Sequence, residues 1–403
     1  MVLKKNWLLI LIALIVFSGL LVRYLDRVPR RNYCDFRVYY KAGQDLIKGK
    51  NIYYREKESI TPFKYSPFFA LVFAPLSLLP IKASAAVFFA LNYISIIFFF
   101  RLSYHLVRHS IIFRTFSDRE VCLVYFLVIF CTIRHIFLVL DSGQVNIIMC
   151  ALVLAGLSCV NRGKDVLAGA FLAASILIKY TPAVFLPYFI LRQRSKVVFW
   201  TVLSIILFLM LPALVVGAQK EMFYLLSWFP SIISTSLDKF SYIYSRNQSI
   251  FSAFIRFLSP TECNVQFFSL SFDQALFYGR MAGLFIYLFV LLPGISKERD
   301  RVIDFSLLLI CLSLFNPNGW DLNFVSLLLP IMLLVQYLVS VRGRDLFILV
   351  SLITAFLSLN IMSKDILGEA AVNYGYAHSF TTFGALIIYV SLLKLKFFDK
   401  EFL

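Results

Sequence analysis

The residues best suited to chemistry are polar side chains that interrupt an otherwise apolar sequence. Asp35 lies in the polar stretch 33–67, shortly after the first apolar run. A carboxylate in such a place acts as a general base when water is excluded around it. It could equally be a solvated acid that Arg31 or Arg37 neutralises. The sequence leaves both interpretations open.

Two amides, Gln144 and Asn146, stand at the start of a predicted helix over 143–160. Asp141 and Ser142 precede them and are typical of a helix N-cap. Capping does not account for the amides, which are costly to expose to lipid. We therefore expect them to hydrogen-bond the hydroxyl groups of a sugar-like ligand.

Candidate cations occur at three positions. Lys179 lies inside the apolar stretch 166–192, where a cation indicates either a functional site or a side chain that reaches a wet cleft. Arg246 and Arg256 flank the polar run 247–249, and guanidinium groups can clamp a phosphate. Downstream, Trp320 is either an interface aromatic or a surface on which a sugar stacks.

Several catalytic classes have no support in the sequence. It contains no Walker A loop, dinucleotide fingerprint, DxD pair or metal-ligand spacing. We therefore predict no cofactor and no metal-ligating residues, although metal dependence stays open, and we favour a lipid-borne donor over a soluble nucleotide donor.

The elements that position these residues are membrane helices. The chain has 403 residues, of which 60% are hydrophobic and 15% charged, with a mean hydropathy of +0.82. Soluble domains contain about 25% charged residues, and apolar runs of about 18 residues or more indicate membrane helices. We predict an all-α polytopic membrane protein. The net charge is +17. We expect much of it to keep short loops in the cytoplasm and some of it to contact anionic lipid headgroups, rather than to bind nucleic acid.

The chain is predicted to form one domain, 1–403, of about 12 membrane helices. The expected spans are 7–24, 82–107, 120–138, 143–160, 197–217, 275–295, 298–316, 321–340, 345–361 and 379–396. The stretch 166–192 adds two short arms of a re-entrant hairpin that turns at residues 179–182, because both of its flanks are basic. The stretch 66–80 is expected to lie at the interface, because otherwise the basic loop 108–119 would face outside.

This arrangement puts the short basic loops and both termini in the cytoplasm. The first loop, 25–81, and the large loop, 218–274, then face outside, the first with interfacial helices and the second with another over 249–258. We expect the active site on this extracytoplasmic face. Near the same boundary we expect Arg134 to pair with Asp141.

Taken in order, the polar motifs resemble those of a known family. The matching residues are Asp35-Phe36, Tyr39, 49–53, Tyr65-Ser66-Pro67-Phe68, Pro75-Leu76, 143–146, Ala168-Gly169, 179–182, Asn247-Gln248-Ser249, Arg256 and Trp320. Over about residues 30–330 the chain resembles the C-type fold of integral-membrane glycosyltransferases, and more closely glycosyltransferase family 87. The outer turn and the hairpin with its central lysine also look like those of the dolichol-linked glucosyltransferases. One departure is Leu322, where family members often carry a histidine two residues after the tryptophan.

The resemblance implies an inverting transfer of a hexose, most simply mannose, from a polyprenyl-phosphate-sugar to a hydroxyl of a lipid or glycan acceptor. Asp35 would be the base. The implied substrate-binding residues are Arg37, Tyr39, Tyr65, Gln144, Asn146, Lys179, Arg246, Asn247, Gln248, Ser249, Arg256 and Trp320. The expected location is a bacterial or archaeal cell membrane. A pentosyl (arabinosyl) transferase with a polyprenyl-phosphate donor, and a membrane transporter or lipid flippase, remain as alternatives.

Overall fold

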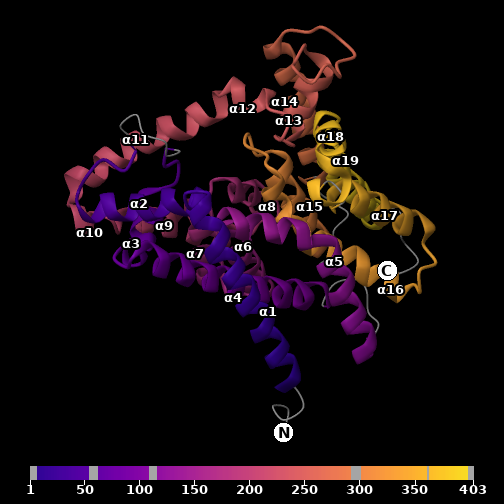
Figure 1. The fold of residues 1–403 in the computed structure, drawn as a ribbon, viewed down its shortest axis with the longest axis horizontal. Helices are drawn as coiled ribbons and strands as arrows, with labels where there is room; N and C mark the ends of the chain where they lie inside the picture. The colour runs from indigo at the N-terminus through magenta and orange to yellow at the C-terminus, as the bar shows by residue number, and fades with distance from the viewer. Residues whose placement is uncertain (1–6, 54–61, 109–115, 292–300, 361–362, 398–403) are drawn as a thin grey trace.

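The structure is a computed structural model that describes residues 7–53, 62–108, 116–291, 301–360 and 363–397 (Figure 1). Within these residues every regular element is a helix, and the one extended pairing is an isolated bridge between Asn247 and Trp320. The prediction of an all-α polytopic membrane protein is confirmed.

Six of the described helices are long and apolar enough to cross a membrane. They are α4 (Ile81–Arg108), α5 (Asp118–Ser142), α9 with α10 (Ser195–Met210 and Ala213–Val216), α14 (Phe272–Leu291), η4 with α16 (Asp321–Leu327 and Leu328–Ser340) and α19 (Phe380–Phe397). Other apolar helices are α1 (Trp7–Arg30), α6 (Asn146–Asn161), α15 (Arg301–Leu314) and α17 (Leu346–Asn360). These elements match the predicted spans to within several residues, although the boundaries predicted at 295 and 298 lie outside the described residues.

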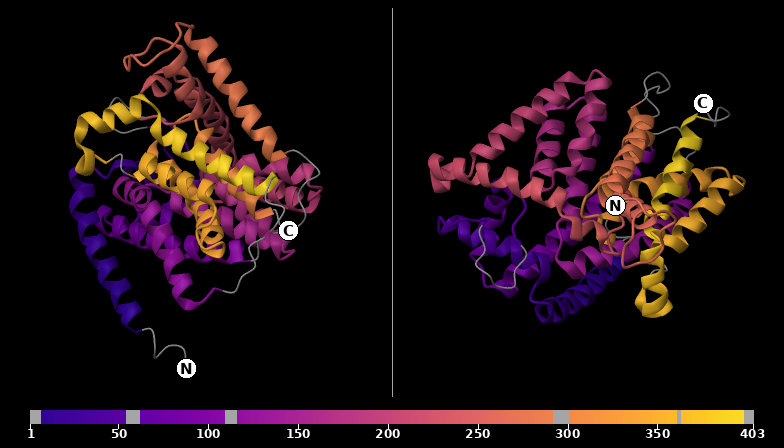
Figure 2. Two further views of the ribbon diagram at one scale, coloured as in Figure 1. Left: turned by 90° about the vertical axis from the view of Figure 1, so that its right-hand side faces the viewer. Right: turned by 90° about the horizontal axis from the view of Figure 1, so that it is seen from above.

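The centre of the bundle is formed by α15 and α16. Every residue of α15 from Val302 to Leu314 is buried, and so is 89% of the 18-residue apolar window within the span formed by η4 and α16. Helices that are apolar on all sides belong in such a position. The helices α4, α5 and α19 pack around α16. Figure 2 shows the C-terminal helices α16 to α19, in yellow shades, gathered at one side of the molecule.

The predicted hairpin is built from α7 (Asp165–Ile178), η2 (Thr181–Val184) and α8 (Phe185–Leu191). The chain breaks at the predicted turn, where Lys179 is extended, with φ −142° and ψ 133°. Helix α7 spans roughly 21 Å, less than the ~30 Å of a hydrocarbon core. It packs closely on α9, because a Cβ added to Gly169 would lie 2.5 Å from the backbone of Trp200.

Helices also occupy the segments predicted to face outside. The first segment contains α2 (Cys34–Ile47) and α3 (Pro67–Ser77), so the stretch predicted to lie at the interface is an 11-residue helix. The later segments contain α11 (Ala218–Leu237), α12 (Lys239–Ile243), α13 (Ile250–Leu258) and α18 (Lys364–Ala377). The predicted helix over 249–258 corresponds to α13.

Helix α11, which the sequence pattern did not predict, is 20 residues long and leads from α10 to α12 along one edge of the molecule (Figure 1). One of its faces is exposed and apolar, with Met222, Leu226 and Phe229, while Tyr224 and Trp228 on the other face are buried. This two-sided pattern is typical of a helix that lies on a membrane surface.

Candidate active site

A cleft of about 990 Å³ lies where several segments far apart in the chain meet. Its lining residues come from the start of α2, from 62–66, from the hairpin turn 177–181, from 238–246, from 316–323, and from α11 and α18. Six of the predicted site residues line it, namely Asp35, Tyr65, Gln144, Lys179, Arg246 and Trp320. The other seven lie outside the lining.

Asp35 lies in the first turn of α2, at the end of a chain of hydrogen bonds. Gln144 Nε2 donates to Asp35 Oδ2 at 2.7 Å, and the Tyr39 hydroxyl donates to Gln144 Oε1 at 3.0 Å. The hydroxyls of Tyr39 and Tyr65 are 2.9 Å apart. Because the Tyr39 hydroxyl donates to the amide oxygen of Gln144, the NH₂ group of the same amide faces the carboxylate of Asp35. Asp35 is therefore half-buried and oriented, and Tyr39 holds the site from behind.

A glycine brings Gln144 up to Asp35. Helix α5 ends at Ser142, and Gly143 takes the left-handed conformation with φ 60°. A Cβ added there would lie 2.8 Å from the Cβ of Phe36. Any other residue would be strained and would push α2 away from the helix junction.

The alternative in which Asp141 or Ser142 caps the next helix is wrong. Both residues are the last of α5, and α6 begins at Asn146 without a side-chain cap. The carboxylate of Asp141 instead accepts a hydrogen bond from Arg23 at 2.7 Å.

The environment of Asp35 suits a base. Burial raises the pKa of its carboxyl above the ordinary value, while the hydrogen bond from Gln144 and the charge of Lys179 act in the opposite direction. A raised pKa moves the proton affinity of a carboxylate toward the range where general bases are efficient. Among the described residues, no ion pair to Asp35 is present. The hydrogen bond from Gln144 therefore orients the carboxylate without neutralising its charge.

Lys179 reaches the cleft from the hairpin turn. Its Nζ donates to Asn146 Oδ1 at 2.5 Å, and the Nδ2 of Asn146 donates to Asn323 Oδ1 at 2.9 Å. Asn323 in turn donates to the backbone oxygen of Asn318 at 2.7 Å. The predicted hydroxyl ligand Asn146 thus lies behind the cleft, where it ties the lysine to the segment before η4.

The polar run Asn247-Gln248-Ser249 and Arg256 are fully buried and lie outside the cleft lining. Asn247 donates to the backbone oxygen of Pro317 at 2.6 Å and accepts from the backbone of Gly319 at 3.1 Å. These bonds hold the loop that carries Trp320.

Arg256 has a similar place in the scaffold. Its Nη1 donates to the backbone oxygen of Asn247 at 2.7 Å, and its Nη2 donates to Ser379 Oγ at 2.7 Å. Ser249 accepts from the backbone of Ser252 and caps α13. The remaining predicted cation, Arg37, is half-buried on α2 and also lies outside the cleft lining.

Part of the cleft lining combines aromatic and charged side chains. The rings of Trp320 and Tyr244 meet edge to face with centroids 5.4 Å apart. Arg246 lies beside the ring of Tyr376, 6.0 Å from its centroid. A wall of this kind can stack a sugar and attract an anion.

Lys64 also lines the cleft, and sequence reasoning missed it. Burial lowers the pKa of its ammonium group, although the charge of Asp238 opposes that shift. The available signal was its place directly before Tyr65, which belongs to the motif that was recognised. Because the stretch 33–67 contains several other lysines and arginines, Lys64 did not stand out among them.

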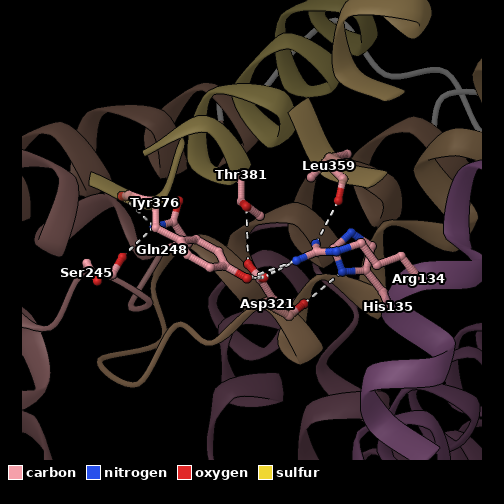
Figure 3. Close-up of polar contacts among 8 residues, drawn as sticks. All are labelled: Arg134, His135, Ser245, Gln248, Asp321, Leu359, Tyr376 and Thr381. Carbon is pink, nitrogen blue, oxygen red and sulfur yellow. Dashed lines mark hydrogen bonds and ion pairs between the residues drawn. The ribbon is translucent and has the colours of Figure 1, made fainter. Parts of the chain in front are cut away.

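The base of η4 is held by the buried ion pair between Arg134 and Asp321 (Figure 3). Arg134 Nη2 lies 2.5 Å from Asp321 Oδ2, which also accepts from the Tyr376 hydroxyl at 2.5 Å. Thr381 Oγ1 donates to Asp321 Oδ1 at 3.2 Å, and Arg134 Nη1 donates to the backbone oxygen of Leu359 at 2.8 Å. This network joins α5, η4, α17, α18 and α19 next to Trp320.

The predicted pairing of Arg134 with Asp141 is therefore wrong. Seven residues along a helix separate two positions by about 10 Å along its axis, and each side chain has a nearer partner. His135 also faces η4, with Nδ1 2.9 Å from the backbone oxygen of Asp321.

The chain also matches a known protein family. The sequence model of glycosyltransferase family 87 matches residues 63–359. These residues include Gln144, Lys179, the buried run 247–249 and Trp320, whereas Asp35 lies before the matched range.

Two relatives come from Mycolicibacterium smegmatis. One, 30% identical over 188 residues, is a polyprenol-phosphate-mannose-dependent alpha-(1-2)-phosphatidylinositol mannoside mannosyltransferase; the match covers 42% of this chain and 41% of the relative. The other, 31% identical over 208 residues, is a polyprenol-phosphate-mannose-dependent alpha-(1-2)-phosphatidylinositol pentamannoside mannosyltransferase, with 48% and 46% covered. The chain thus spans less than half the length of these relatives.

The family match covers most of the chain, it includes the hairpin and most of the cleft, and the described fold is a helical membrane bundle. The chain belongs to glycosyltransferase family 87.

Proposed function

We propose that the protein transfers a hexose, mannose by likeness to its two relatives, from a polyprenyl-phosphate-sugar to an acceptor hydroxyl with inversion at the anomeric carbon. The observation that carries this proposal is the oriented, half-buried carboxylate of Asp35 in a cleft that also holds Lys179. A base and a cation in one cleft fit the displacement of a phosphate by a hydroxyl oxygen.

In the proposed step, the acceptor oxygen attacks the anomeric carbon while its proton passes to a carboxylate oxygen of Asp35. The bond between the anomeric carbon and the phosphate oxygen breaks at the same time. The electron pair of that bond leaves with the polyprenyl phosphate. A single displacement of this kind inverts the anomeric centre.

The leaving phosphate needs positive charge where its own negative charge develops. Lys179, Arg246 and Lys64 are the candidates in the cleft. Arg256 and Arg37, which the sequence also suggested, are left out of this step because neither lines the cleft. Trp320 would stack on the transferred or the accepting sugar.

The proposal is tested with membranes that contain the overproduced full-length protein. The lipids of these membranes supply the acceptors. We expect radioactivity to pass from polyprenyl-phosphate-[14C]mannose into a lipid-extractable or glycan product, with inverted configuration at the new linkage. Polyprenyl-phosphate-arabinose serves as the second donor. Transfer from arabinose alone would favour the pentosyl alternative, and transfer from neither donor would contradict the proposal.

Lys179 is the cation we expect to matter most. The Lys179→Met variant removes the ammonium group and is expected to lower kcat by about 10²- to 10³-fold, the usual loss when a transition-state charge partner is removed. Lys179→Arg should retain part of the activity, because it keeps the charge. The matched control is Lys220→Met, which removes an exposed lysine that hydrogen-bonds the backbone of Gly49. Equal rates in Lys179→Met and Lys220→Met would show that the charge of Lys179 is dispensable.

We further propose that the cleft faces the extracytoplasmic side and that both termini are cytoplasmic. The support is the excess of lysine and arginine in the short loops at the opposite ends of the helices. A phosphatase reporter fused after residue 113, which lies outside the described residues, should be inactive, while one fused after Thr261 should be active. The reverse result would invert the proposed orientation.

A further inference from the structure

The loop 316–320 forms one wall of the candidate active-site cleft, and two of its residues have no part in the proposed transfer step. We call it the asparagine loop. Asn316, Asn318 and Trp320 alternate along it, and all three line the cleft. The sequence points to Trp320 as a substrate-binding residue, but not to either asparagine. The position of the two asparagines in the cleft raises the question of what their amides bind.

The backbone of the asparagine loop is held by the buried run before α13. Asn247 Nδ2 donates to the backbone oxygen of Pro317 at 2.6 Å, and the backbone nitrogen of Gly319 donates to Asn247 Oδ1 at 3.1 Å. The backbone nitrogen of Gln248 donates to the backbone oxygen of Gly319 at 2.7 Å. The loop is therefore pre-organised, which lowers the entropy cost of binding a ligand to it.

The amide oxygens of both asparagines are bonded within the protein. Asn316 Oδ1 accepts from the backbone nitrogen of Asn318 at 3.0 Å, and Asn318 Oδ1 accepts from the hydroxyl of Ser241. Each NH₂ group therefore points away from the bond that its own oxygen makes. Among the described residues neither Nδ2 atom has a hydrogen-bond partner, and both remain accessible where these residues line the cleft. Two oriented donors are thus left for a ligand.

An aromatic surface belongs to the same part of the cleft lining. The rings of Trp320 and Tyr244 meet edge to face with centroids 5.4 Å apart, and both residues line the cleft. Aromatic side chains with a few placed polar groups are the usual lining of a small-molecule site. A sugar complements both features, because its ring has an apolar face and its hydroxyl oxygens accept from N–H groups. The donors are neutral, which suits a hydroxyl better than a phosphate.

We propose that Asn316 and Asn318 are substrate-binding residues, which donate through Nδ2 to hydroxyl groups of a sugar stacked on Trp320. This inference rests on the proposed function, which brings a sugar into the cleft. The sugar is either the one that is transferred or one that belongs to the acceptor, and the asparagines recognise its hydroxyl groups in both cases. Because the bonds form before the reaction begins, they stabilise the bound substrate and the transition state alike.

The first measurement is sugar binding without transfer. Saturation-transfer NMR with methyl α-mannoside is carried out on the full-length protein in detergent, for the wild type and for Asn316→Ala/Asn318→Ala. The matched control is Asn161→Ala, which removes an exposed asparagine amide at the end of α6. A second control, Ser241→Ala, removes the internal bond to Asn318 and keeps both NH₂ groups. The Tm without sugar reports whether each variant folds.

We expect the double variant to bind methyl α-mannoside about tenfold to hundredfold more weakly than the wild type, since each lost hydrogen bond weakens binding about threefold to tenfold. Asn161→Ala should bind like the wild type, and Ser241→Ala should lose less than the double variant. Equal binding by the folded double variant and the wild type, no binding by the wild type, or an equal loss in Ser241→Ala would overturn the inference.

The single variant Asn318→Ala keeps the test open if the double variant does not fold. It leaves the bond from the backbone of residue 318 to Asn316 in place. It should bind the sugar about threefold to tenfold more weakly than the wild type, and wild-type binding would contradict the role of Asn318.

The second measurement is KM in the transfer assay, with polyprenyl-phosphate-mannose as donor and a lipid extract of the membranes as acceptor. In Asn318→Ala the KM for one substrate should rise about threefold to tenfold, while kcat changes less because uniform binding is lost. A rise for the donor assigns the asparagines to the transferred sugar, and a rise for the acceptor assigns them to the accepting sugar.

The two measurements separate this inference from the proposed function. Unchanged KM values in an active Asn318→Ala variant would contradict the inference and leave the proposed transfer in place. Sugar binding that depends on the two asparagines, in a wild-type protein that transfers no sugar, would contradict the transfer and support the sugar site.

Discussion

Replacing Asp35 by asparagine is expected to lower the rate of sugar transfer by about 10²- to 10⁴-fold, the usual contribution of a general base. The asparagine side chain has nearly the same shape and can still meet Gln144, so the fold should be retained. The measurements are kcat/KM with a polyprenyl-phosphate-sugar donor, and the Tm of the purified variant. The matched control is Asp26→Asn, which removes an exposed carboxylate paired with Arg30.

The pH dependence provides a second readout for the same residue. As the proposed base, Asp35 would act only when deprotonated, so activity should fall as the pH drops through its pKa. Because burial raises that pKa above its ordinary value, the loss begins at a higher pH than for a solvated carboxyl. The residual activity of Asp35→Asn should lack this acidic limb. Wild-type rates and an unchanged pH profile in Asp35→Asn would contradict the mechanism.

The second large effect is expected from Arg134→Met. The variant leaves the buried carboxylate of Asp321 without its cation, and breaking one half of a buried ion pair costs about 3–5 kcal/mol. Tyr376 and Thr381 still donate to Asp321, so we expect a value toward the lower end. The measurement is the Tm and the urea midpoint of the protein in detergent.

The ion-pair prediction can be separated from a simple packing loss. The double variant Arg134→Met/Asp321→Asn removes both charges and should be more stable than Arg134→Met alone, because no buried charge of this pair remains unpaired. The matched control is Arg27→Met, which breaks an exposed contact with Asp141 at 3.6 Å and should cost about 0–1 kcal/mol. If Arg134→Met were as stable as Arg27→Met, the network would have no structural role.

The network also links stability to the candidate active site. Asp321 begins η4 directly after Trp320, and the backbone oxygen of Asp321 lies 2.9 Å from Nδ1 of His135. Movement of η4 would shift Trp320 and the Asn323 partner of Asn146, and through them Lys179. This chain of contacts gives a structural role to polar residues that lie away from the cleft and are buried between five helices.

Much of the architecture was predictable from residue type and order. Long apolar runs predict membrane helices because the backbone must satisfy its own hydrogen bonds in lipid. Basic residues on both sides of 166–192 predicted the hairpin, and the break at Lys179 lies where the sequence places it. The amphipathic helix α11 was missed because its apolar stripe is mixed with polar residues and contains Pro230.

The sequence by itself determined the membrane class, the hairpin turn, and Asp35, Gln144 and Lys179 as candidates, because these properties depend on local composition and on charges placed among apolar residues. Only the tertiary structure decided which polar residues line the cleft and which support it. Arg256 and Asn247 resemble ligand-binding residues in sequence, yet their partners are Ser379 and Pro317. The physical reason is that a buried polar group needs a hydrogen-bond partner, and the sequence does not tell whether that partner is a ligand or a distant part of the chain. Arg134 illustrates this, since its partner Asp321 lies 187 residues away.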